Sequence, residues 1–234
     1  LLLPLTLVAS GASAAGYADD WQPRRTILAL IGLVALHAAV NALNEASDML
    51  SGIDLATKRT PFSGGSGTLP SGALSPRAAF LFGLAAAGVG LAIGVVLLFE
   101  AGLLLLPVMI AGAMCILAYT DFLARRALGE LAAGLGLGAL PVMGSALVQN
   151  GTLPVEAAAA AVPAFLMAFN LLLLNEFPDE EPDRAGGRKN IVLALGRRGA
   201  AFVYAIAALL VPASIAVAVS AGALPKPCLV ALAP

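Results

Sequence analysis

The feature that most constrains this chain is a series of apolar stretches, each about as long as a bilayer is thick. A helix needs about 20 apolar residues to cross the hydrocarbon core of a membrane. We find seven such stretches, and the start of an eighth near Cys228; they cover residues 1–16, 27–47, 78–99, 101–120, 131–148, 155–175 and 200–221. This pattern predicts an all-α, polytopic transmembrane helical bundle, with residues 1–234 forming a single integral-membrane domain.

The composition supports a membrane location. Of the 234 residues, 60% are hydrophobic and 12% are charged, whereas a soluble domain is about 25% charged. So little charge cannot cover a water-soluble globule, which excludes a soluble enzyme, a nucleic-acid binder and a disordered chain. The two cysteines lie far apart and suggest neither a disulfide framework nor a metal site. Because the chain starts and stops inside apolar runs, we expect both ends to be cut from a longer membrane protein.

The few charged residues gather in three loops. Residues 48–77, 120–130 and 177–199 hold ten of the thirteen Lys and Arg residues. By the positive-inside rule we expect these loops to face the cytoplasm, in a multi-pass protein of the inner (cytoplasmic) membrane. Ten of the fourteen acidic residues lie on the same side. Since acidic residues contribute little to orientation, this coincidence is the first sign of a functional site.

The first acidic cluster lies at the end of the second apolar stretch. His37, Asn41, Asn44 and Asp48 recur at spacings of four, three and four, which places them on one face of a helix. An ionisable residue near a membrane span is a functional hypothesis by default, because polar groups exposed to hydrocarbon are costly. The alternative interpretation is that Asn41 and Asn44 only join helices through hydrogen bonds.

The second acidic cluster follows the sixth stretch. Asn175, Asp179 and Asp183 step by four and would project from one face of a helix leaving the membrane, although Pro178 and Pro182 perturb that helix. For an isolated cluster, a solvated acidic loop is the simpler interpretation. In both clusters, however, an Asn precedes an Asp by four residues at the end of a span, and this repetition favours a site.

Facing carboxylates repel each other unless a cation lies between them. Hard oxygen ligands suit Mg²⁺, which proteins usually hold with one or two carboxylates and the phosphates of a substrate. Neighbouring cations could bind the remaining phosphate charge; they are Lys58, Arg59, Arg125, Arg126, Arg188 and Lys189. With apolar helices around such a site, the sequence predicts a lipid diphosphate substrate from which the diphosphate departs.

At the first cluster the chain resembles the UbiA superfamily of intramembrane aromatic prenyltransferases. The first motif of that family, Asn-Asp-x-x-Asp followed by a further Asp, is similar to Asn44-Glu45-Ala-Ser-Asp48 together with Asp54. Glu45 stands where the family has Asp, which keeps the charge but lengthens the side chain. The family has about nine spans, so the resemblance implies a UbiA-type fold of which this chain contains most.

The second family motif, Asp-x-x-x-Asp, is matched by Asp179-Glu-Glu-Pro-Asp183. The segments 119–130 and 183–196 are also similar to this family, so the resemblance runs along the whole chain. Within the superfamily, Ser51-Gly52-Ile53-Asp54 is most similar to the branch that prenylates 1,4-dihydroxy-2-naphthoate in menaquinone biosynthesis. The hydroxybenzoate enzymes have an Asp at the position of Gly52.

The resemblance implies Mg²⁺-dependent transfer of a polyprenyl group from a polyprenyl diphosphate to an aromatic acceptor within the lipid bilayer. The acceptor would be 1,4-dihydroxy-2-naphthoate; 4-hydroxybenzoate of ubiquinone biosynthesis is the alternative, and a membrane transporter is the alternative from another class. A transporter would place its polar groups near the middle of the membrane, whereas these acids lie at one face.

The resemblance also implies roles for individual residues. The catalytic residues would be Asp48, Asp179 and Asp183. The metal ligands would be Asn44, Asp48, Asp54, Asp179 and Asp183. The substrate-binding residues would be Lys58, Arg59, Tyr119, Arg125, Arg126, Arg188 and Lys189.

Overall fold

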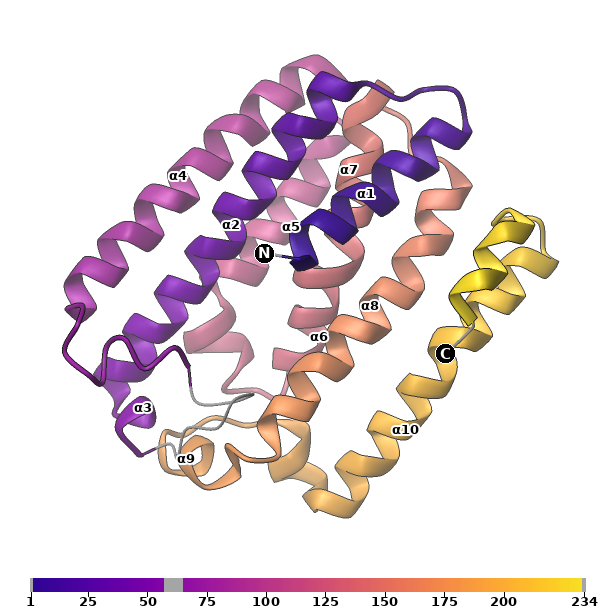
Figure 1. Ribbon diagram of the computed structural model, residues 1–234. Helices are drawn as coiled ribbons and strands as arrows, with labels where there is room; N and C mark the ends of the chain where they lie inside the picture. Colours follow the sequence, from indigo (N-terminus) through magenta and orange to yellow (C-terminus); the bar gives the residue numbers. More distant parts are fainter. Residues whose placement is uncertain (1, 57–64, 233–234) are drawn as a thin grey trace.

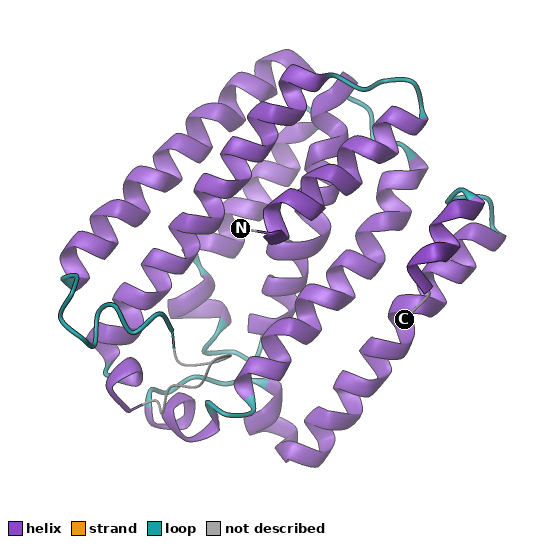
Figure 2. Ribbon diagram, in the orientation of Figure 1, coloured by secondary structure: helices purple, strands orange, loops and turns teal. Residues whose placement is uncertain are grey.

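The computed structural model describes residues 2–56 and 65–232, and in these residues it contains helices and loops but no β-strand (Figure 2). The α-helices are α1 (Leu2–Tyr17), α2 (Pro23–Ser51), α3 (Ile53–Ala56), α4 (Pro76–Ala101), α5 (Leu105–Leu117), α6 (Gly129–Gly134), α7 (Leu140–Asn150), α8 (Val155–Glu176), α9 (Glu180–Ala185) and α10 (Ile191–Ser220). Two π-helical turns, η1 (Tyr119–Leu123) and η2 (Leu135–Ala139), flank α6, and a 3₁₀ helix, η3 (Lys226–Leu232), follows α10.

In each of the seven predicted apolar stretches the described residues are mainly helical; the stretch 101–120 also contains the turn between α4 and α5. Five helical segments are long and apolar enough to cross a membrane: α2, α4, the continuous segment Gly129–Asn150, α8 and α10. The helices α1 and α5 are apolar but shorter. The residues near Cys228, where an eighth span was expected to begin, form η3, which lies beside α10 (Figure 1). The prediction of an all-α transmembrane bundle is confirmed.

The helix that contains the seventh predicted span, α10, begins earlier than expected. The sequence predicts it over residues 200–221, whereas α10 begins at Ile191. Asn190 caps this helix, because its Oδ1 accepts a hydrogen bond from the backbone N–H of Leu193 at 2.8 Å. The helix then bends at Gly196, whose backbone has φ 69° and ψ 167°. Glycine adopts this positive φ without steric strain, so the cap and the bend add a short apolar segment, residues 191–195, before the predicted span.

The helices α2 and α4 pack closely because small residues lie between them. A Cβ atom on Gly83 would lie 2.8 Å from Cγ of Leu43, and one on Gly90 would lie 2.5 Å from Cγ of Leu36. Close approach through small residues is the usual way in which helices associate in lipid, where the hydrophobic effect does not drive them together. The polar face of α2 that was predicted from its spacing is therefore turned away from α4.

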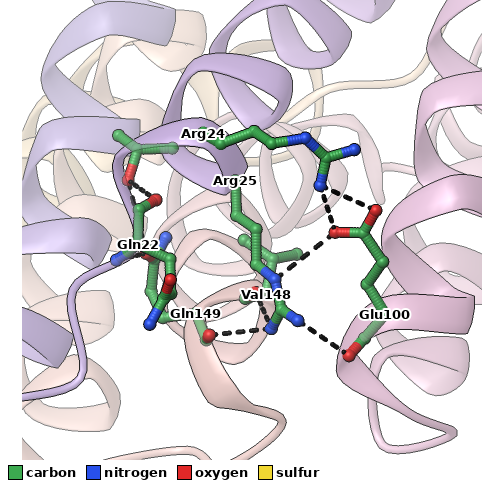
Figure 3. Close-up of polar contacts among 7 residues, drawn as sticks. Gln22, Arg24, Arg25, Glu100, Val148 and Gln149 are labelled. Atoms are coloured by element: carbon green, nitrogen blue, oxygen red, sulfur yellow. Dashed lines mark hydrogen bonds and ion pairs between the residues drawn. The ribbon is translucent and has the colours of Figure 1, made fainter.

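At one end of the bundle, Arg25 joins three helices (Figure 3). It lies at the start of α2 and donates to the backbone oxygens of Gln149 at 2.8 Å and Glu100 at 3.1 Å, which lie in the last turns of α7 and α4. Arg24 forms an ion pair of 2.8 Å with the Glu100 side chain. Helices leave their last carbonyl groups without partners. The guanidinium of Arg25 supplies hydrogen bonds to such carbonyl groups, which would otherwise need water. The candidate site lies at the other end of α2.

Candidate active site

The two acidic clusters meet at one end of the bundle. Asp48 lies near the end of α2, and Asp183 lies in the short helix α9; Figure 1 shows α9 beside α3, just beyond the end of α2. Arg188 bridges the two carboxyl groups: its Nη2 donates to Oδ1 of Asp48 and its Nη1 lies 3.4 Å from Oδ1 of Asp183. The structure therefore brings together three residues that were selected from two distant parts of the sequence.

Asp183 is buried and firmly held. It is 3% exposed, and its Oδ2 accepts a hydrogen bond from Nδ2 of Asn190 at 2.9 Å. Its backbone oxygen accepts from the N–H of Arg188, also at 2.9 Å. Burial raises the pKa of the Asp183 carboxyl to about 6, while the positive charge of Arg188 opposes this rise. Burial thus disfavours the charged form of Asp183, and the neighbouring guanidinium offsets part of this cost.

Asp179 lies just before α9. Its Oδ1 is buried and has no hydrogen-bond partner among the described residues. Burial raises the pKa of its carboxyl, and Arg188 again opposes the rise. Asn175, Asp179 and Asp183 do not lie on one helix, because α8 ends at Glu176 and α9 begins at Glu180. Pro178 lies in the turn between them and has no N–H with which to continue the helical hydrogen bonds.

The same three residues nevertheless line one cavity of about 50 Å³. Its polar lining consists of Tyr119, Asn175, Glu176, Asp179, Asp183, Arg188, Lys189 and Asn190. The loop that carries Lys189 is paired with the loop before α6: the N–H of Lys189 donates to the oxygen of Ala124 at 2.8 Å, and the N–H of Ala127 donates to the oxygen of Lys189 at 3.1 Å. This pairing places Tyr119 and Lys189 at the same cavity.

Other predicted residues lie elsewhere or outside the described part of the chain. Arg125 and Arg126 are exposed and do not line the cavity, and the guanidinium of Arg126 lies 3.6 Å from the centre of the Phe122 ring. Asp54 belongs to α3, but its side chain is outside the described part. Lys58 and Arg59 also lie outside the described residues. The roles assigned to these residues stay predictions.

Two residues of the first motif, Asn44 and Glu45, point in different directions from α2. Asn44 lies one helical turn before Asp48 on the same face of α2. Glu45 points to the loop before α4, where its two carboxylate oxygens accept from the backbone N–H and the hydroxyl of Ser66 at 2.9 and 2.8 Å. The longer side chain that distinguishes this chain from the family motif therefore anchors a loop.

Two buried acids were not selected by the sequence analysis. Glu130 is 1% exposed and Glu176 is 8% exposed, and Oε2 of each is buried without a hydrogen-bond partner among the described residues. Oε1 of Glu130 accepts from the backbone N–H of Ile191 at 2.5 Å, which ties α6 to the start of α10. Their burial results from the packing of distant segments; the only signal in the sequence was an acid next to an apolar run.

The donor groups suit Mg²⁺, although their arrangement includes a competing cation. Asn44, Asp48, Asp179 and Asp183 offer hard oxygen ligands, and the buried Oδ1 of Asp179 has no partner among the described residues. Within those residues, no three acidic, His or Cys side chains converge on one point that could hold a metal ion. The guanidinium of Arg188 lies between Asp48 and Asp183 instead.

Comparison with known proteins agrees with this fold. The UbiA prenyltransferase family matches residues 2–234, so the chain belongs to this family, as the motifs predicted. A curated relative, 1,4-dihydroxy-2-naphthoate octaprenyltransferase from Bacillus subtilis (strain 168), is 26% identical over 179 residues, which are 75% of this chain and 56% of the relative. The chain thus spans little more than half the length of this relative.

The fold also resembles that of a solved structure, a UbiA homolog from Archaeoglobus fulgidus bound to GPP and Mg²⁺. The two structures superpose with a TM-score of 0.65 at 18% sequence identity, over 92% of this chain and 76% of that one. At this identity the similarity concerns the fold. It places the described helices in the arrangement of the UbiA family.

Proposed function

We propose that this protein transfers a polyprenyl group from a polyprenyl diphosphate to an aromatic acceptor, with Mg²⁺ as cofactor. The observation that carries the proposal is the convergence of Asp48, Asp183 and Arg188 at one end of an apolar helical bundle. Acidic groups for a divalent cation and basic groups for a diphosphate then lie next to helices that suit a hydrocarbon tail. Membership of the UbiA prenyltransferase family supports the same reaction.

The acceptor that we propose is 1,4-dihydroxy-2-naphthoate. The curated relative is a 1,4-dihydroxy-2-naphthoate octaprenyltransferase, and the Ser-Gly-x-Asp pattern that ends at Asp54 is most similar to that branch. The alternative acceptor is 4-hydroxybenzoate, whose enzymes have an Asp at the position of Gly52. We also propose that the site faces the cytoplasm from an inner membrane, since ten of the thirteen basic residues lie on that side.

In this mechanism the chain acts mainly by binding, orienting and shielding the reactants. Asn44, Asp48, Asp179 and Asp183, with Asp54, would hold Mg²⁺. When bound, Mg²⁺ supplies positive charge that stabilises the departing diphosphate. Arg188 and Lys189 would donate to the diphosphate oxygens from the cavity that they line.

The proposed reaction breaks one bond of the prenyl diphosphate and forms one bond to the acceptor. The C–O bond between the prenyl C1 and the diphosphate breaks, and a ring carbon of the acceptor forms a new bond to C1. With the naphthoate acceptor, the carboxylate leaves as carbon dioxide and its bonding electrons restore the aromatic ring. Tyr119 lies at the cavity, where its ring would support the allylic cation, and the apolar helices keep out water that would otherwise react with that cation.

The test is an assay of membranes that contain the full-length protein, with a polyprenyl diphosphate, Mg²⁺ and each acceptor in turn. We expect a prenylated naphthoate product by mass spectrometry. The Asp183→Asn variant should lose at least about 100-fold in rate, because a preorganised electrostatic group typically contributes that much. The matched control is Asp19→Asn, at an exposed position with φ 61° that Asn tolerates. A folded preparation that gives no product with either acceptor would contradict the proposal.

A further inference from the structure

Arg188 occupies a position that a bound cation would be expected to take. Its guanidinium touches one carboxyl group from each acidic motif, Asp48 in α2 and Asp183 in α9. The Arg188 side chain is 20% exposed, and those of Asp48 and Asp183 are 16% and 4% exposed. In such a poorly hydrated place, two carboxylates need a positive partner to remain close together. Arg188 supplies that partner from within the chain.

Hydrogen bonds fix the backbone that carries Arg188, whereas the long side chain can change its partner. The N–H of Arg188 donates to the oxygen of Asp183 at 2.9 Å, and the N–H of the next residue, Lys189, donates to Ala124 at 2.8 Å. A guanidinium carries five donors in a rigid plane that fits carboxylate and phosphate oxygens equally well. A turn of the long side chain could therefore move the charge from a carboxylate to a phosphate without moving the loop.

A divalent cation and Arg188 would compete for the same oxygen atoms. Oδ1 of Asp48 and Oδ1 of Asp183 both face the guanidinium, and nowhere among the described residues do three acidic, His or Cys side chains converge on a point that could hold a metal ion. A cation that approaches alone must displace Arg188 and leave its buried charge without a partner, which is unfavourable. A cation that arrives with a diphosphate brings a new partner for Arg188.

We propose that Arg188 acts as an internal substitute for the divalent cation, joining the two acidic motifs until a metal–diphosphate complex binds and then moving onto the diphosphate. This inference rests on the proposed function, because it assumes a diphosphate substrate. It makes the binding of metal and diphosphate mutually dependent: the metal alone binds weakly, and each one raises the affinity for the other by the same factor. The two acidic motifs are thereby kept together in the absence of substrate.

The first experiment measures Mn²⁺ binding to the full-length protein in detergent without any diphosphate, by electron paramagnetic resonance of free Mn²⁺. We expect Arg188→Gln to bind Mn²⁺ at least roughly tenfold more tightly than the wild type, because a close positive charge has been removed from the cation position. Arg184→Gln is the matched control, since Arg184 pairs with Glu180 at 3.1 Å on the exposed side of α9. Unchanged or weaker Mn²⁺ binding by Arg188→Gln would overturn the inference.

The second experiment repeats the titration with inorganic pyrophosphate present. Pyrophosphate should increase Mn²⁺ affinity strongly in the wild type and in Arg184→Gln, but several-fold less in Arg188→Gln. An equal increase in all three proteins would show that Arg188 does not move onto the diphosphate. If Arg188→Gln fails to fold, Arg188→Lys replaces it; its single ammonium cannot make the same bridge, so its Mn²⁺ affinity should exceed that of the wild type, and a wild-type value would contradict the inference.

These readouts separate the inference from the proposed function. If the wild-type protein forms no prenylated product, the proposed transfer reaction fails, whatever the metal titrations give. If product forms and the Mn²⁺ affinity of Arg188→Gln equals that of the wild type, the reaction stands and the role of Arg188 as a substitute cation fails.

Discussion

At the scale of single residues, Glu130 ties α6 to the start of α10, next to the candidate site. Its Oε1 accepts the backbone N–H of Ile191 at 2.5 Å, directly after Asn190, which holds Asp183. Replacing Glu130 by Leu should reduce the free energy of unfolding by about 1–3 kcal/mol, since a hydrogen-bonding partner of a partly buried N–H is lost. Glu130→Gln keeps an oxygen acceptor and should lose less.

The measurement for Glu130 is thermal unfolding of both variants in detergent, followed by helical circular dichroism. Equal unfolding temperatures for Glu130→Leu and the wild type would show that the hydrogen bond to Ile191 contributes little. A larger loss in Glu130→Gln than in Glu130→Leu would also contradict this interpretation of the contact.

A second prediction at this scale concerns pH. The carboxyl of Asp183 has a pKa of about 6 because it is buried, so its neutral form is already populated in mildly acidic solution. Protons then compete with a metal ion for the same oxygens. We expect the affinity of the wild-type protein for Mn²⁺ to be nearly constant above pH 7 and to fall as the pH drops below about 6. An affinity that is unchanged between pH 7 and pH 5 would exclude Asp183 as a titrating ligand.

At the scale of helices, Arg25 should stabilise the bundle more than its neighbour Arg24. The side chain of Arg25 is 23% exposed and donates to carbonyl groups near the ends of α4 and α7, whereas that of Arg24 is 68% exposed and pairs with the Glu100 side chain (Figure 3). Arg25→Met should cost about 1–3 kcal/mol, and Arg24→Met, as the matched control, less than about 1 kcal/mol. Unfolding of both variants by a denaturing detergent measures the difference, and equal losses would contradict it.

The sequence predicts most of the helices but fewer of their ends. Apolar length alone finds each of the seven helical stretches, and the polar face of α2 follows from spacing because that helix continues unbroken to Ser51. The end of α8 at Glu176 lies one residue beyond the predicted stretch 155–175, whereas the start of α10 at Ile191 was not predicted. These boundaries depend on Pro178 and on the cap at Asn190, whose effect is decided by the contacts that each makes in the fold.

For the candidate site, the sequence predicts several of the residues but not the contacts that they make. Asp48, Asp183 and Arg188 were selected by residue type and spacing, and the structure places them together. The bridge made by Arg188, the burial of Glu130 and the direction of Glu45 toward Ser66 could not be predicted. Each depends on segments far apart in the sequence, and no local pattern records which distant group a long side chain will meet.

At the scale of the whole molecule, the polar contacts are concentrated at the two ends of the bundle. Arg24, Arg25 and Glu100 lie at one end, and the Asp48–Arg188–Asp183 bridge lies at the other. Between them the helices pack through small and apolar side chains. Changes at one end should therefore leave the other intact: Arg25→Met is expected to lower stability while leaving the Mn²⁺ affinity of the folded protein unchanged.

The length of α2 determines where chemistry can take place. Its 29 residues correspond to roughly 44 Å, whereas the hydrocarbon layer is about 30 Å thick, so the last turns of this helix reach the zone of lipid headgroups and water. Asp48 lies in those turns. An amphiphilic substrate could then enter from the bilayer, with its charged headgroup in contact with water and its hydrocarbon tail in the lipid. Neither the headgroup nor the tail of that substrate would have to leave its own environment for the substrate to reach the acceptor.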